Sequence, residues 1–118
     1  MIEIDQIKKI GDIIYSEGMI LGLFKYESGD LILCSHCIDG SGEIYFSSKI
    51  SSLKKYFQNE INLYQVYLES DDFIVTQTFR KEIISYLKDD IVEMITFGNK
   101  FYLEIPESMR NDKLAKII

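Results

Sequence analysis

Residue types that often mark a domain boundary or a reactive site are scarce in this chain. Its 118 residues include one Pro, one His, two Cys and no Trp. No Pro-, Gly- or Ser-rich stretch forms a linker, so we expect one α+β domain over residues 1–118. Two Cys are too few for a disulfide framework, and a domain of this size buries enough surface to fold without one.

Long apolar runs are also missing. The longest spans Met19 to Phe24, far short of the roughly 20 residues that cross a bilayer. The first five residues are acidic where a secretory signal is basic. We therefore expect a cytoplasmic protein without membrane contact, whose two thiols are reduced.

Basic residues are outnumbered. Nineteen Asp and Glu against thirteen Lys and Arg give a formal charge of -6. Such a surface repels phosphate backbones, so nucleic acid is not an expected partner.

Ala is nearly absent, whereas β-branched and aromatic residues abound. The chain has one Ala, twenty Ile, eight Tyr and seven Phe, a balance that favours pleated sheet over helical bundles. We expect an α+β fold in which a mainly antiparallel sheet of five or six strands packs against two helices.

Residues 19–47 predict an antiparallel meander. Apolar runs at 19–26, 31–38 and 43–47 are separated by turn-forming residues, and Gly29 suits a positive φ. The middle run is apolar at both alternating sets of positions, as in a central strand covered on both faces.

Two helices are predicted further along. The first begins at a Ser48 or Ser51 cap and ends near Asn59, and the second spans 80–89. The first would bury one stripe and expose two lysines. The stripe is Leu53, Tyr56 and Phe57, and the lysines are Lys54 and Lys55.

The remaining segments include a strand at 72–78 and a hairpin of 91–97 with 100–105 around Gly98-Asn99. Residues 107–118 form a tail that is either helical or frayed.

Two segments fit either strand or helix. Residues 6–16 have helical Ile spacing, yet Gly11 also suits a bent strand, which we favour for their second half. Residues 62–68 stay open between the two.

A Tyr-bearing strand, a hairpin through a Gly turn and a short polar-capped helix follow one another in residues 13–68. The stretches that carry this order are Ile13-Ile14-Tyr15, Leu23-Phe24, Gly29-Asp30-Leu31, Gly42-Glu43-Ile44-Tyr45 and Asn62-Leu63. In this order the chain resembles small uncharacterised bacterial domains. The resemblance covers about half the chain and implies a fold, but no activity or site.

Potential metal ligands concentrate only in Cys34-Ser35-His36-Cys37. A closed zinc site needs four ligands, and the chain has no second Cys/His pair. On a strand, Cys34 and His36 share one face while Ser35 and Cys37 share the other, so the two sulfurs diverge. A nucleophile at Cys34 with His36 as its base lacks a third, orienting group. We therefore assign no catalytic, cofactor or metal site, and keep Cys34, His36 and Cys37 as the alternative.

The carboxylate pairs Asp71-Asp72 and Asp89-Asp90 fall at predicted element ends. Turn formation explains them better than paired acid/base chemistry.

Fifteen Phe and Tyr exceed what one small core readily hides, and Tyr is enriched at binding hot spots. The interaction candidates are Tyr26, Tyr45, Tyr64, Tyr67 and Tyr102. The sequence thus favours a non-catalytic module that binds another protein or itself, such as an immunity-type or inhibitor protein of a bacterial or phage conflict system. The alternatives are a metal- or thiol-dependent protein centred on Cys34, His36 and Cys37, and an acidic mimic of nucleic acid.

Overall fold

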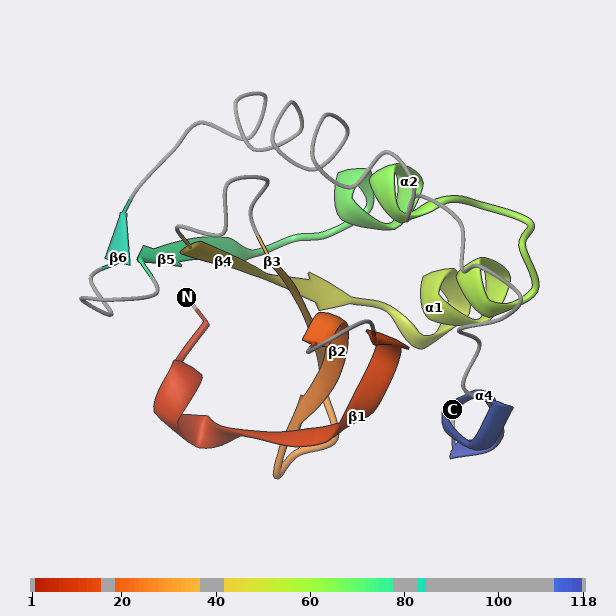
Figure 1. Cartoon of the computed structure of the whole chain (residues 1–118), viewed down its shortest axis with the longest axis horizontal. Coiled ribbons are helices and arrows are strands. Elements are labelled where there is room, and N and C mark those ends of the chain that lie inside the picture. The colour runs from red at the N-terminus through yellow and green to blue at the C-terminus, as the bar shows by residue number, and fades with distance from the viewer. Residues whose placement is uncertain (1, 16–18, 37–41, 78–82, 85–111, 118) are drawn as a thin grey trace.

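The computed structural model describes residues 2–15, 19–36, 42–77, 83–84 and 112–117, and in them an antiparallel sheet follows the order of the chain (Figure 1). Its six strands lie side by side in the order β1 to β6. They are β1 (Ile7–Tyr15), β2 (Met19–Tyr26), β3 (Leu31–His36), β4 (Gly42–Ser48), β5 (Phe73–Gln77) and β6 (Ile83–Ile84). Two helices, α1 (Ile50–Phe57) and α2 (Leu63–Leu68), connect β4 to β5. The predicted α+β class, with its antiparallel sheet and two helices, is confirmed.

The sheet is covered on both faces. One face packs against α1 and α2 in the larger core cluster, which includes Leu33, Phe46 and Tyr67. The other face carries a smaller cluster of Ile2, Ile32, Cys34, Tyr45 and Ile74. Alternate residues of β3 enter the two clusters, so the prediction of a central strand buried on both faces is confirmed.

The meander is confirmed, with β3 ending at His36. Gly29 occupies the β2–β3 turn at φ 98°, the positive φ expected for it. The second predicted turn, at 39–42, lies mostly outside the described residues.

Residues 6–16 form a strand for most of their length. A single 3-10 turn, η1 (Ile4–Gln6), leads into β1. The register of β1 against β2 shifts between Lys9 and Gly11 and again between Asp12 and Ile14, so the strand bends as the glycine suggested.

The predicted apolar stripe of α1 is confirmed, but its predicted cap is wrong. The stripe is buried and Lys54 and Lys55 are exposed. Lys49, not a serine, occupies the N-cap and makes no side-chain capping bond. The Ser48 hydroxyl instead donates to the Lys49 carbonyl at 3.2 Å, and Ser51 already lies inside the first turn.

α1 ends in a Schellman motif centred on Asn59. The Asn59 N–H donates to the Tyr56 carbonyl at 3.1 Å, and the Glu60 N–H donates to the Lys55 carbonyl at 2.9 Å. Asn59 has φ 59°, the left-handed conformation that the motif requires at this position.

Substitutions at Asn59 should therefore change stability in opposite directions. Asn59→Gly removes the steric cost of left-handed backbone and is expected to raise the free energy of unfolding by about 0.5 kcal/mol. Asn59→Ala should lower it by about 1 kcal/mol because Ala tolerates this conformation poorly. Urea unfolding of the three proteins measures both effects, and a stabilised Asn59→Ala would contradict the motif.

Residues 62–68 form α2 behind a capping box. Asn62 Oδ1 accepts from the Gln65 N–H at 3.0 Å, while Gln65 Oε1 accepts from the Asn62 N–H at 2.8 Å. This reciprocal pair settles the open choice in favour of helix.

β5 confirms the predicted strand, whereas the predicted helix at 80–89 is wrong at its centre. Ile83 and Ile84 pair with Thr76 and Val75 as the short strand β6. Here β-branched residues extend the sheet instead of forming a helical stripe. The rest of that segment, the hairpin at 91–105 and Asp89-Asp90 lie outside the described residues.

Part of the predicted tail is helical and docks. α4 (Asp112–Ile117) packs on β1, and Leu114 is only 3% exposed. A Cβ placed on Gly11 would lie 3.0 Å from Cδ2 of Leu114. The missing side chain of Gly11 therefore makes the space that Leu114 fills.

Candidate functional site

Three segments far apart in the sequence meet at one end of the sheet. Leu31 at the start of β3 pairs with Ser48 at the end of β4, and Phe46 of β4 pairs with Phe73 at the start of β5. Antiparallel pairing therefore brings the β2–β3 turn, the start of α1 and the α2–β5 connection to the same end of the sheet.

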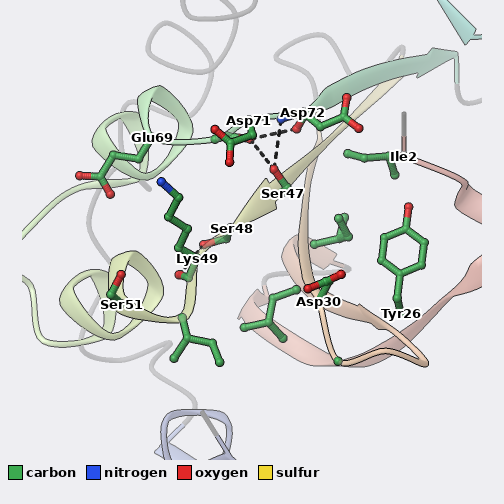
Figure 2. Close-up of a pocket in the computed structure, with 15 residues that line it drawn as sticks. Ile2, Tyr26, Asp30, Ser47, Ser48, Lys49, Ser51, Glu69, Asp71 and Asp72 are labelled. Atoms are coloured by element: carbon green, nitrogen blue, oxygen red, sulfur yellow. Dashed lines mark hydrogen bonds between the residues drawn. The ribbon is translucent and has the colours of Figure 1, made fainter.

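A groove of about 790 Å³ opens between these segments (Figure 2). We call it the acidic groove. It is lined by Ile2, Tyr26, Gly29, Asp30, Leu31, Ile32, Ser47, Ser48, Lys49, Ile50, Ser51, Glu69, Ser70, Asp71 and Asp72.

The charged lining of the acidic groove is mostly negative. Among the described residues that line it, four are acidic (Asp30, Glu69, Asp71 and Asp72) and one, Lys49, is basic. Figure 2 shows Lys49 extending toward the side that carries Glu69 and Asp71, while Asp30 lies beside Tyr26. A positively charged group entering the groove would meet carboxylates on both sides.

Hydrogen bonds fix the backbone of the α2–β5 side. The hydroxyl of Ser47 lies 3.1 Å from that of Ser70 and accepts from the Asp72 N–H at 3.2 Å. The Ser70 hydroxyl donates to the Asp72 carbonyl at 2.9 Å, and the Ser47 N–H donates to the same oxygen at 2.9 Å. Asp72 and its neighbour Asp71 are thereby held against the end of β4.

Glu69 is oriented from the opposite helix. Its carboxylate accepts a hydrogen bond from the hydroxyl of Ser52, which is buried in the first half of α1. This charge-assisted bond joins the start of α1 to the end of α2. Hydrogen bonds thus fix both the Glu69 side chain and the Asp72 backbone at the groove.

A second polar cluster lies on the face of the sheet opposite α1 and α2. The Tyr45 hydroxyl donates to Glu43 Oε2 at 2.8 Å, and Cys34 Sγ lies 3.9 Å from the same oxygen. Burial, then the neighbouring Cys34 and Glu43, raise the pKa of Tyr45 well above its ordinary 10.0. The hydroxyl therefore remains a hydrogen-bond donor.

This pKa predicts a loss of stability in alkali. The pKa of Tyr45 is higher in the folded than in the unfolded chain. The contribution of Tyr45 to the free energy of unfolding is therefore complete below about pH 10 and declines as the pH rises above it. Burial raises the pKa of Tyr56 as well. Tyr45→Phe should therefore flatten, but not abolish, the fall in unfolding free energy between pH 9 and pH 11.

Urea unfolding across that pH range tests the prediction. Tyr56→Phe, at the second buried tyrosine, should flatten the same curve. Equal slopes for the wild type and Tyr45→Phe would show that Tyr45 ionises alike in the folded and unfolded chains.

The structure describes only part of the alternative site formed by Cys34, His36 and Cys37. Cys34 is fully buried, and Ser35 and Cys34 occupy opposite faces of β3 as expected. His36 occupies the register position opposite Glu43, and Cys37 lies outside the described residues. Among the side chains that the structure describes, no three His, Cys, Asp or Glu gather as metal ligands. The metal- or thiol-dependent reading stays a prediction.

The candidate tyrosines do not share one surface. Tyr67 is fully buried and Tyr45 is 8% exposed, so both belong to the core and their assignment to an interaction surface is corrected. Their rings pack edge-on against Phe46 and Phe24, respectively. Tyr26 and Tyr64 are half-buried, and Tyr102 lies outside the described residues. Of the described candidates, only Tyr26 lines the acidic groove.

Sequence reasoning missed the groove because no single segment contains it. Asp71-Asp72 does fall at an element end, in the connection between α2 and β5. One feature of the sequence does indicate the groove: Asp30 directly precedes β3, and Asp72 directly precedes β5. In a meander, those two strands begin at the same end of the sheet.

No family model matches the chain, and a search of curated proteins and of solved structures found no match either. The resemblance of residues 13–68 to small bacterial domains therefore stays an expectation. Within the described part of the chain, no helix has the length and apolar character needed to cross a membrane.

Proposed function

We propose that this protein is a non-catalytic interaction module that binds another protein through the acidic groove. The observation that carries the proposal is the described lining of the groove, in which four acidic residues and one lysine accompany apolar residues. Concave surfaces with an apolar floor and a few fixed polar groups are typical binding sites. The acidic residues of the groove would attract a partner with a positively charged surface.

The charge of the whole chain supports a partner of opposite sign. With a net charge of -6, two copies repel each other at long range, whereas a basic protein is attracted. An inhibitor that covers a basic surface of a toxin or nuclease is the class of role that this chemistry favours. The proposal places the protein in the cytoplasm, where the buried Cys34 stays reduced.

The proposal is tested by reversing charge inside and outside the groove. The groove variant is Asp30→Lys with Asp71→Lys, both at exposed positions. The matched control is Glu60→Lys with Glu27→Lys, which changes the net charge equally at exposed positions outside the lining. Circular dichroism confirms folding, and affinity capture from lysate followed by light scattering gives the composition of any complex.

We expect a stoichiometric complex with the wild type and the control that is lost with the groove variant. A complex that all three proteins retain equally would exclude the groove as its interface. A wild type that stays monomeric and captures no protein would count against an interaction module altogether.

A further inference from the structure

We infer that the acidic groove accepts an extended segment of a partner protein in which Lys or Arg side chains stand next to an aliphatic side chain. This inference rests on the proposed function and adds the chemistry of the bound segment. The apolar and charged lining of the groove, its size and its position in the sheet support it.

The groove is also lined by apolar residues. Ile50 is 52% exposed at the start of α1 and lines the groove together with the half-buried Leu31. Single exposed apolar residues are ordinary, but these two lie in one concavity with the buried Ile2 and Ile32. An aliphatic side chain placed there would remove apolar surface from water.

The rim supplies charge from two sides. Asp30 comes from the β2–β3 turn, whereas Glu69, Asp71 and Asp72 come from the α2–β5 connection. A segment with ammonium or guanidinium groups on both sides of an aliphatic side chain would place its positive charges near the acidic residues of both sides. Ser52 holds the Glu69 side chain, and two serines hold the Asp72 backbone. Because these groups are already ordered, binding loses little conformational entropy in them.

Size and position favour a segment over a folded surface. A volume of about 790 Å³ falls in the range of sites that enclose a small ligand or a few side chains. The groove lies across the ends of β3, β4 and β5, all of which already have strand neighbours. The segment would therefore bind through its side chains and not as an added strand.

Fluorescence anisotropy with labelled decapeptides tests the inference. The first peptide alternates Lys and Ile, the second replaces Ile by Ser, and the third replaces Lys by Glu. We expect the Lys–Ile peptide to bind most tightly, the Lys–Ser peptide more weakly and the Glu–Ile peptide not at all. Binding should weaken between 50 mM and 500 mM salt because exposed charges are screened.

Variants of the chain then locate the site. Asp30→Lys with Asp71→Lys should weaken Lys–Ile binding at least about tenfold, since two attractions become repulsions. Lys49→Gln should strengthen it by removing the positive charge of Lys49 from the lining. Ile50→Ser should reduce the preference for Ile over Ser, and Glu60→Lys with Glu27→Lys should leave the affinity within about twofold.

Equal binding of the Lys–Ile and Glu–Ile peptides, or a groove variant that binds as the wild type does, would overturn the inference. So would the absence of binding by every peptide. If the peptides fail while the groove variant still abolishes capture of a protein, the segment chemistry is wrong and the proposed function stands. If the groove variant changes neither peptide binding nor protein capture, the inference and the proposed function both fail.

Discussion

Replacing Tyr67 by alanine is expected to lower the free energy of unfolding by about 3–5 kcal/mol. Tyr67 is fully buried on α2. Its ring packs edge-on against Phe46 of β4 at 5.5 Å and against Phe73 of β5 at 6.0 Å between centroids. Removing the ring leaves a cavity between the helix and two strands, which such a core fills only in part. The loss is a large share of the 5–15 kcal/mol that stabilises a typical domain.

Tyr64→Ala provides the matched control, because Tyr64 is half-buried on the same helix. We expect it to cost about 1 kcal/mol. Urea unfolding followed by circular dichroism measures both variants. A Tyr67→Ala protein that unfolds like the wild type but loses its partner would restore the interface assignment made from the sequence.

The second large effect concerns the docking of α4 on β1. Gly11→Val places a branched side chain where Cδ2 of Leu114 would be only 3.0 Å from its Cβ. We expect this overpacking to displace α4 and to cost about 2 kcal/mol, despite the better strand propensity of valine. Leu114→Ala should cost a similar amount, about 2 kcal/mol, by emptying the same space.

The pair distinguishes a specific contact from general strain in β1. In the Leu114→Ala background, Gly11→Val should cost at least about 0.5 kcal/mol less than it does alone, since the two substitutions share one space. Trypsin should also cleave after Lys113 faster in Gly11→Val, where α4 is released. Additive costs together with unchanged cleavage would show that Gly11 serves only the bend of β1.

Much of the described fold follows from local patterns in the sequence. The β2–β3 turn was predicted because Gly29 tolerates positive φ, and α1 because its apolar residues recur on one stripe. The same approach failed at Ile83-Ile84, where pairing with β5 outweighed a helical spacing. The intrinsic helix or strand propensity of so short a segment does not determine its structure, because pairing with a neighbouring strand outweighs it.

The candidate site was less predictable for a geometric reason. An aromatic count indicates that some rings reach the surface, but it cannot say which ones. α2 turns Tyr67 toward the sheet and leaves Tyr64 half-buried, and this depends on where the capping box at Asn62 starts the helix. The acidic groove likewise depends on strand register, which joins Asp30 and Asp72 only after the meander has formed.

The uneven spacing of the strands along the chain bears on how the molecule folds. Only four residues, 27–30, separate β2 from β3, whereas 24 residues, 49–72, separate β4 from β5. Chain entropy makes closing the longer connection costlier. The hairpins from β1 to β4 can therefore assemble early, and the docking of β5 is expected to come late in the folding reaction. Since β5 and its preceding connection complete the acidic groove, a chain that has not finished folding would have no groove to offer a partner.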